Sequence, residues 1–323
     1  MAEQSYRDAI KAALREEMQR DERVFILGEE VGVWGGTYAV TRGLYDEFGA
    51  KRVRDTPIAE AVIVGAAMGA AMGGLRPVAE LMTINFSLVA IDQIVNNASK
   101  MFYMFGGQFS CPVVIRTPAG WGQLAATHSQ SFEAWYASLP GLIVAMPATP
   151  LDAKGLLKRA LRSNNPVMFI EHARLYNVTG EVPDGDYTIP FGVSEIKRAG
   201  RDVTIVSYSR MLHVALAAAN QLAQENIEAT VIDLRTLRPL DLAPVIESVK
   251  QTHRAVIVEE DWVSCGMGAE IAARIGKDAF DYLDAPVERL GAIEVPMPYS
   301  KPLEALALPE EKHIIARVKE MVR

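Results

Sequence analysis

The sequence predicts an α/β protein built from two doubly wound domains, and three observations lead to this fold class. The chain has 323 residues, 50% of them hydrophobic, which suits two domains with sizeable cores. Short apolar segments alternate with longer segments of helical periodicity, as in a parallel sheet covered by helices on both faces. This alternation breaks once, around 176–200, and then resumes.

The first half of the alternation begins with a helix that Ser5 caps, because Tyr6, Ile10 and Leu14 follow it at helical spacing. A short apolar run at 24–27 ends at Gly28, as expected for a buried strand. The same reasoning extends along the chain. It predicts further helices at 58–73, 92–105 and 152–162, and further strands at 77–80, 112–116, 142–145 and 167–171.

The segment that interrupts the alternation contains Thr, Gly, Pro and Asp and is the expected connection between domains. The predicted division is a first domain at 1–185, a linker at 186–200 and a second domain at 201–323. In the second domain we expect strands at 203–207, 229–234, 255–259 and 287–290, and helices at 212–222, 241–252, 267–275 and 310–322.

Charge and cysteine content exclude several classes of function. A net charge of −7 without a dense Lys/Arg block argues against a nucleic-acid-binding surface. Cys111 and Cys265 fit no zinc or redox motif, so a reducing, cytoplasmic compartment is expected. The N-terminus lacks leader-peptide features, although a processed organellar chain stays open. The uncharged run 61–75 is too short to span a membrane and predicts a buried core helix.

Common nucleotide and metal motifs are missing from the sequence. It contains no phosphate-loop motif, and Ile271 stands where a dinucleotide fingerprint starting at Gly266 would need its third glycine. The five histidines show no metal-ligand spacing.

Glu60 is the strongest candidate for a functional acid. It stands just before the uncharged run and after Pro57, which restricts Thr56 to extended geometry and suits a first helical turn. A buried carboxylate without a nearby cation is expected to hold or share a proton. A first-turn carboxylate stabilised only by the helix dipole would occupy the same position, so the sequence position alone does not decide.

Gly65, Gly69 and Gly73 lie four residues apart and form a smooth stripe on the same helix. Each glycine costs about 1 kcal/mol relative to alanine, so the close approach of another backbone is the expected compensation. Packing within the chain and packing at a subunit interface explain the stripe equally well.

Short motifs along the whole chain resemble those of a known family. They read GEE at 28–30, DTPIAE at 55–60, GGLRP at 73–77, DQ at 92–93, HSQ at 128–130, DAKGL at 152–156 and PMPY at 296–299. In this order they resemble the β subunits of the 2-oxo acid dehydrogenase E1 component, within the transketolase-like thiamine diphosphate family. The likeness is greatest to the β subunits of pyruvate dehydrogenase E1.

The resemblance implies a pyrimidine-binding N-terminal domain, a transketolase-like C-terminal domain and assembly with an α subunit into an α2β2 heterotetramer. It places thiamine diphosphate between the subunits, with Mg²⁺ held by the α subunit. The family's diphosphate motif, Gly-Asp-Gly followed by Asn-Asn, is absent here, so this chain is not expected to bind the whole coenzyme alone. The implied reaction is oxidative decarboxylation of pyruvate with acetyl transfer to the lipoyl group of E2, without nucleic-acid or membrane partners.

The resemblance also assigns roles to individual residues. Glu60 corresponds to the glutamate that hydrogen-bonds N1′ of the aminopyrimidine, while Ile58, Met82 and Phe86 correspond to the apolar residues around that ring. His128 corresponds to a residue at the mouth of the site, with an implied role in substrate binding or acyl transfer.

Some members of this family bind a structural K⁺ through backbone carbonyls. The matching positions here are Val113, Ala160, Leu161, Ser163 and Asn165. Ser163 replaces a common aspartate, which leaves the occupancy of the ion open. The loop 118–122 also departs from the family, because Trp121 stands where small residues are usual.

Three alternatives remain beside the pyruvate enzyme. The β subunits of branched-chain 2-oxo acid and acetoin dehydrogenases share Glu60 and His128. A thiamine enzyme complete in one chain is disfavoured by the missing diphosphate motif, and a purely docking subunit is disfavoured by the presence of Glu60. The helix at 310–323 is a candidate contact for E2.

Overall fold

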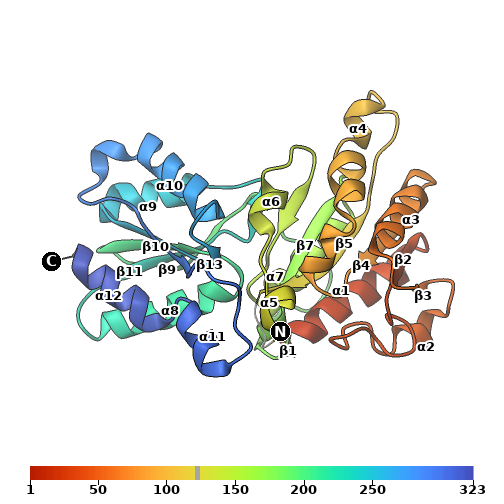
Figure 1. Cartoon of the computed structure of the whole chain (residues 1–323), viewed down its shortest axis with the longest axis horizontal. Coiled ribbons are helices and arrows are strands. Elements are labelled where there is room, and N and C mark those ends of the chain that lie inside the picture. Colours follow the sequence, from red (N-terminus) through yellow and green to blue (C-terminus); the bar gives the residue numbers. More distant parts are fainter. Residues whose placement is uncertain (121–123, 323) are drawn as a thin grey trace.

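The computed structural model describes residues 1–120 and 124–322 of the chain. Within them, two main β-sheets form the centres of two α/β units, which lie side by side along the long axis of the molecule (Figure 1). The two-domain α/β architecture expected from the sequence is confirmed.

The first sheet has seven strands among the described residues, in the order β12-β6-β7-β5-β4-β2-β3. Neighbouring strands are parallel, except that β12 is antiparallel to β6. The strands are β2 (Val24–Gly28), β3 (Val53–Asp55), β4 (Arg76–Glu80), β5 (Val114–Ala119), β6 (Ile143–Ala145), β7 (Val167–His172) and β12 (Thr236–Arg238).

Helices cover both faces of this sheet, because successive residues of a strand point to opposite sides. Ile26 packs in a buried cluster with α1 (Tyr6–Arg20) and α7 (Pro150–Leu161). The next residue, Leu27, packs on the other face with α3 (Glu60–Met72). The doubly wound arrangement therefore follows from the apolar character of both faces of each strand.

The second sheet has the strand order β14-β13-β10-β11-β9. Its strands are β9 (Glu195–Arg198), β10 (Val203–Ser207), β11 (Ala229–Asp233), β13 (Ala255–Trp262) and β14 (Glu288–Ala292). Helices α8 (Ser209–Ala223) and α12 (Glu311–Met321) cover one face, and α9 (Ala243–Thr252) and α10 (Met267–Asp278) cover the other (Figure 1).

Short elements complete the described chain. They are the strands β1 (Ala2–Ser5) and β8 (Thr179–Val182), which pair with each other, and the α-helices α2 (Leu44–Phe48), α4 (Met101–Met104), α5 (Ala125–His128), α6 (Glu133–Ala137) and α11 (Lys301–Ala307). The 3₁₀-helices are η1 (Ile84–Leu88), η3 (Ala173–Leu175) and η4 (Phe280–Tyr282), and η2 (Gln93–Ala98) is a π-helix.

Three elements differ from the sequence-based expectation. The helix expected at 58–73 begins at Glu60, with Ala59 as its N-cap, so Pro57 lies outside it. The helix expected at 92–105 is divided into a π-helix, η2, and the separate short helix α4. The segment expected as a linker at 186–200 contains β9, which pairs antiparallel with β11.

β12 joins the two units in an unexpected way. It follows the strand β11 of the second sheet along the chain, yet it pairs with β6 of the first sheet. One buried hydrophobic cluster also includes residues of both sheets, among them Met168 and Ile257. The two sheets therefore share a continuous core.

Only one face of α3 is buried. Val64 is fully buried against the sheet, whereas Val62 is 65% exposed on the opposite face of the helix. The prediction of a buried core helix at 61–75 is therefore wrong for half of its surface. Among the described residues, no helix has both the length and the apolar character that crossing a membrane requires.

Candidate active site

The candidate residues lie on loops at one edge of the first sheet. Strands β3, β2, β4 and β5 are parallel neighbours, so their carboxyl ends meet at this edge. Glu60 follows β3, Met82 and Phe86 follow β4, and His128 follows β5. Open α/β sheets bind their ligands at the carboxyl edge, and this fold brings the four residues there from distant parts of the sequence.

Glu60 is a buried carboxylate at the amino end of a helix. It is the first residue of α3 and is only 5% exposed. Its N-cap, Ala59, offers no side-chain hydrogen bond to the helix. Among the described residues no cationic side chain forms an ion pair with Glu60. The carboxylate is therefore free to bind a ligand group that donates a hydrogen bond.

Glu29 is a second buried carboxylate at this edge, to which the sequence assigned no role. It follows β2 and is 8% exposed, and its Oε1 atom is buried without a hydrogen-bond partner in the described chain. Burial raises the pKa of Glu29, and the negative charges of Glu60 and Glu30 raise it further. The only sequence feature that could have indicated a role for Glu29 was its position in the GEE motif, directly after a predicted strand.

Glycines hold the loop that carries Glu29 close to neighbouring strands. A side chain at Gly28 would come within 2.7 Å of the carbonyl oxygen of Glu80. The N–H of Gly32 donates to Oδ1 of Asp55 at 2.6 Å, which attaches the loop to the end of β3. These contacts fix the backbone beside the two buried carboxylates.

A buried ion-pair network lies under the same edge. Arg116 of β5 pairs with both Glu80 of β4 and Glu171 of β7. The hydroxyl of Tyr176 donates to Oε2 of Glu171 at 2.6 Å. Burial acts to lower the pKa of Arg116, but the two carboxylates outweigh it and raise this pKa. Glu80 and Glu171 thus form ion pairs with the guanidinium of Arg116, whereas Glu29 and Glu60 have no cationic partner among the described residues.

His128 and Phe86 lie together at the edge of the sheet. Their ring centroids are 5.3 Å apart, and both side chains are half-buried. Nδ1 of His128 is 3.4 Å from Oδ1 of Asn85, which also accepts a hydrogen bond of 2.5 Å from the hydroxyl of Thr83. The imidazole is therefore held loosely beside an aromatic ring.

Met82 and Ile58 do not complete an enclosed pocket in the single chain. Met82 is half-buried, whereas the side chain of Ile58 is 80% exposed. Ile58 could line a coenzyme site only after another chain covers it, and its role stays a prediction.

Four of the five backbone carbonyls predicted for K⁺ already have hydrogen-bond partners. Arg76 donates from Nε to the carbonyl oxygen of Leu161 at 2.7 Å and from its guanidinium to that of Ser163 at 2.6 Å. The carbonyl of Ala160 accepts the N–H of Ser163, and that of Val113 accepts a backbone N–H across the sheet. The N–H of Asn165 donates to the Ser163 hydroxyl at 3.1 Å. A cationic side chain therefore occupies two of the predicted ligands.

Only part of the altered loop at 118–122 is described. Trp121 lies outside the described residues. Gly120 has φ = +73°, a left-handed conformation that favours glycine, and its N–H donates to the carbonyl of Gln130 at 3.1 Å. This hydrogen bond closes the segment that carries His128.

A large part of the exposed apolar surface lies next to these loops. Phe102 and Tyr103 on α4 are 57% and 88% exposed, and Gly69 on α3 has open space where a side chain would stand. Helices α3 and η2 contact each other, and Figure 1 shows α3 and α4 on the same side of the first sheet. The other exposed apolar side chains of 58–109 are Ile58, Val62, Met72, Leu75, Leu88, Val89, Met104, Phe105 and Phe109.

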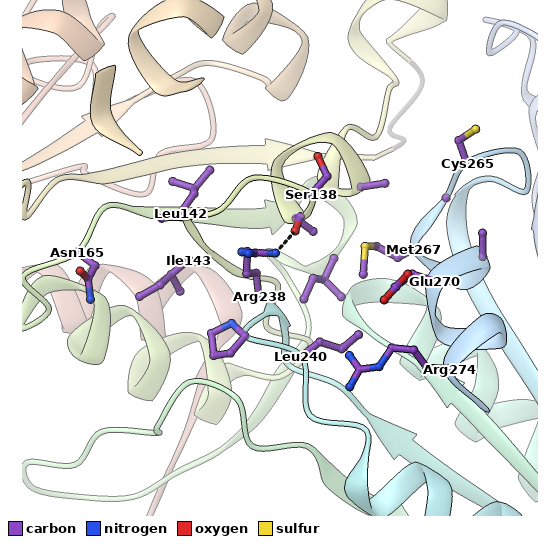
Figure 2. A pocket seen from close by; sticks show the side chains of 17 residues that line it. Ser138, Leu142, Ile143, Asn165, Arg238, Leu240, Cys265, Met267, Glu270 and Arg274 are labelled. Atoms are coloured by element: carbon purple, nitrogen blue, oxygen red, sulfur yellow. Dashed lines mark hydrogen bonds between the residues drawn. The ribbon is translucent and has the colours of Figure 1, made fainter. Parts of the chain in front are cut away.

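A large cavity of the described chain lies elsewhere. It is an open cleft of about 870 Å³ between the two units, and Figure 2 shows Ser138, Arg238 and Met267 among its lining side chains. Arg238 donates to the carbonyl oxygen of Ala137 at 3.0 Å on its wall. Glu60 does not line this cleft, so cavity size alone does not locate the predicted site.

Comparison with known proteins places this architecture in a family. Residues 2–179 match the model of the transketolase pyrimidine-binding domain, and residues 192–314 match that of the transketolase C-terminal domain. The fold is also similar to a solved structure described as a split gene transketolase, inactive beta4 tetramer, with a TM-score of 0.81 over 98% of both chains and 24% identity. The fold and its two domains define a transketolase-like protein.

Full-length relatives narrow the family. The chain is 50% identical to the pyruvate dehydrogenase E1 component subunit β of Rickettsia felis over 98% of this chain and 97% of that one. It is 49% identical to the mitochondrial pyruvate dehydrogenase E1 component subunit β of Caenorhabditis elegans, over 97% of this chain and 91% of that one. The chain belongs to the family of pyruvate dehydrogenase E1 component β subunits.

Proposed function

We propose that this chain is the β subunit of a thiamine diphosphate-dependent pyruvate dehydrogenase E1. With an α subunit, it decarboxylates pyruvate oxidatively and transfers the acetyl group to the lipoyl arm of E2. The observation that carries the proposal is Glu60, a carboxylate 5% exposed at the carboxyl edge of a pyrimidine-binding domain. The full-length similarity to pyruvate dehydrogenase E1 β subunits favours pyruvate over branched-chain 2-oxo acids and acetoin.

The residues present fit the aminopyrimidine of the coenzyme. A buried, unpaired carboxylate suits a heterocyclic ring nitrogen that must share a proton, and Phe86 offers a half-buried aromatic ring at the same edge. When bound, thiamine diphosphate supplies the nucleophile and the electron sink for decarboxylation.

The protein's contribution is to hold and move protons at this edge. Glu60 would hold the coenzyme by sharing a proton with N1′ of its aminopyrimidine ring. Burial and the charge of Glu60 raise the pKa of Glu29, so Glu29 keeps its proton to a higher pH than an exposed glutamate. His128 then lies beside Phe86, where it can contact the 2-oxo acid or the incoming lipoyl group.

The proposed partner is an α subunit that covers the apolar surface of α3 and α4. Exposed aromatic side chains such as Tyr103 and the open stripe at Gly69 fit an interface better than a solvated surface.

The diphosphate and Mg²⁺ are assigned to this partner, since the present sequence lacks the Gly-Asp-Gly motif. We also assign E2 as a partner, with α12 as a candidate contact, and the cytoplasm as the compartment.

For K⁺ we propose that occupancy is weak or absent. The guanidinium of Arg76 supplies positive charge to the carbonyls of Leu161 and Ser163, and Ser163 adds no formal charge of its own. Replacing K⁺ with Na⁺ should then leave the thermal stability of the complex unchanged. A marked rise in melting temperature with K⁺ alone would contradict this assignment.

The function is tested by co-expressing the chain with an α subunit that carries the diphosphate motif. Acylation of a lipoyl domain is measured with pyruvate, 3-methyl-2-oxobutanoate and acetoin, and release of CO2 is measured with the two 2-oxo acids. We expect the highest kcat/KM with pyruvate. Glu60→Gln should lower it by about 10²–10⁴-fold while the complex still assembles. Persistent turnover in this variant, or preference for another substrate, would contradict the proposal.

A binding measurement addresses the single-chain alternative. Calorimetry of the chain without a partner, in thiamine diphosphate and Mg²⁺, should show no tight binding. Tight binding would favour an enzyme complete in one chain.

A further inference from the structure

A buried contact between the two domains lies directly under the segment that carries His128. His172, the last residue of β7, is 2% exposed, and Glu260 of β13 is 9% exposed. Nε2 of His172 lies 2.9 Å from both carboxylate oxygens of Glu260. Arg210 of α8 also donates to Oε2 of Glu260, at 3.2 Å. The C-terminal domain thus places a fixed carboxylate against the end of the first sheet.

Local hydrogen bonds fix the orientation of the imidazole. Nδ1 of His172 accepts the backbone N–H of Arg174 at 3.1 Å, so Nε2 is the nitrogen that presents a proton to Glu260. The ring therefore has a defined partner on each side and little freedom to rotate. A defined side chain of this kind can support the backbone that lies above it.

Gly120 rests on this pair. A side chain at Gly120 would approach Oε1 of Glu260 at 2.6 Å and would collide with Nε2 of His172. Gln130, which accepts the N–H of Gly120, lines a small cavity of about 10 Å³ together with Glu260. Gly120 and Gln130 therefore both lie against the C-terminal domain, and His128 is two residues before Gln130.

We propose that Glu260 is a positioning residue for His128. By holding His172 against Gly120, it fixes the position of Gly120 and, through the hydrogen bond between Gly120 and Gln130, the position of residues 124–130, and hence the distance between the imidazole and Phe86. The C-terminal domain then contributes to substrate or lipoyl handling without touching either. This inference rests on the proposed function of His128 at the mouth of the site.

Glu260→Ala removes the two carboxylate oxygens that accept a hydrogen bond from His172. Gly120→Ala introduces a methyl group that collides with His172 and Glu260. In the complex with the α subunit, both substitutions should lower kcat/KM for lipoyl acetylation about 10-fold or more, because small misplacements of a reacting group have effects of this size. Glu260→Gln retains an acceptor for His172 and should restore most of the loss. Rates are expressed per active site, so that unfolded protein does not contribute.

Glu304 provides the matched control. It is 3% exposed on α11 and pairs with Arg174 across the same domain interface at 2.7 Å, without contact to Gly120. Glu304→Ala should reduce thermal stability as Glu260→Ala does, yet leave kcat/KM unchanged. Equal kinetic effects of the two substitutions would overturn the inference.

A second readout does not depend on activity. Carbethoxylation of His128 by diethyl pyrocarbonate, followed by mass spectrometry, should be several-fold faster in Glu260→Ala and Gly120→Ala than in the unmodified chain or Glu304→Ala. An unchanged rate would show that Glu260 does not position His128. A wild-type complex that fails to decarboxylate pyruvate would instead overturn the proposed function, even if the labelling rate changes as expected.

Discussion

Two pairs of buried carboxylates in the first domain differ in what surrounds them. Glu80 and Glu171 lie on either side of Arg116 and are bound to it. Glu29 and Glu60 lie one loop away, and no described cation pairs with either. Burying a charged group without a partner is unfavourable, so the second pair is retained at an expense in stability. The difference separates carboxylates that hold the sheet together from carboxylates kept available for a ligand.

Arg116→Met should have the largest effect on stability. It leaves Glu80 and Glu171 buried without their cation, and breaking a buried pair in this way costs about 3–5 kcal/mol. The free energy of unfolding, measured by urea denaturation, should fall accordingly. Arg317→Met, which breaks an ion pair with the exposed Glu320, should change it by no more than about 1 kcal/mol. Equal losses in the two variants would remove the distinction between the two carboxylate pairs.

Stability should also fall as pH rises, because two further buried acids are unusually weak. Burial and the charge of Asp152 raise the pKa of Asp233 to about 7. Burial, with a smaller contribution from Glu259, raises the pKa of Asp261 to about 7 against a backbone hydrogen bond from Trp262. Each folded-state pKa exceeds the value of about 3.9 expected in the unfolded chain.

Between these pKa values the folded state therefore holds protons that the unfolded state has lost. The melting temperature should fall as pH rises from about 4 to about 7, and this contribution should level off above pH 7. Asp261→Asn should make the decline shallower. A melting temperature that rises steadily over this range in the unmodified chain, with the same slope in the variant, would contradict the assignment.

Glu60→Gln tests the pair of carboxylates that has no cationic partner. Replacing an unpaired buried carboxyl group by an amide of the same shape should leave the free energy of unfolding unchanged or raise it. Calorimetry of the isolated variant tests this expectation. A large loss of stability would place Glu60 with the structural carboxylates instead.

Glu29→Gln should produce the smallest effect. Burial and the negative charges of Glu60 and Glu30 raise the pKa of Glu29, so Glu29 ionises at higher pH than an exposed glutamate. The variant should show a smaller dependence of kcat/KM on pH on the acidic limb, with little change at the optimum. A pH profile identical to that of the unmodified enzyme would exclude electrostatic coupling between the two residues.

The sequence was most informative where local pattern and tertiary packing agree. The cap at Ser5, whose hydroxyl accepts the N–H of Asp8 at 3.1 Å, and the strand at β2 were predicted because apolar spacing and flanking residues pointed to the same element. The secondary-structure prediction was wrong where tertiary contacts determine the local conformation. The π-helix at 93–98 has no local signal that distinguishes it from an α-helix, and β9 forms only because β11 is available to pair with it.

Site residues were predictable to the extent that motifs carried them. Burial of Glu60 was expected from its uncharged surroundings, and the structure has it 5% exposed. The proximity of Glu29 to Glu60, and of Arg76 to the carbonyls at 161 and 163, depends on contacts between segments far apart in the sequence. No spacing rule within one segment could have revealed them.

β12 has a consequence for any attempt to divide this protein. A fragment that ends before residue 236 would leave β6 as an open edge, with unpaired N–H and C=O groups on an apolar strand. Such edges recruit strands from other molecules. The N-terminal half expressed by itself should therefore self-associate into insoluble material. Extending the fragment to Arg238 covers β6 but leaves β10 without its neighbour β13, so this division also creates an open edge.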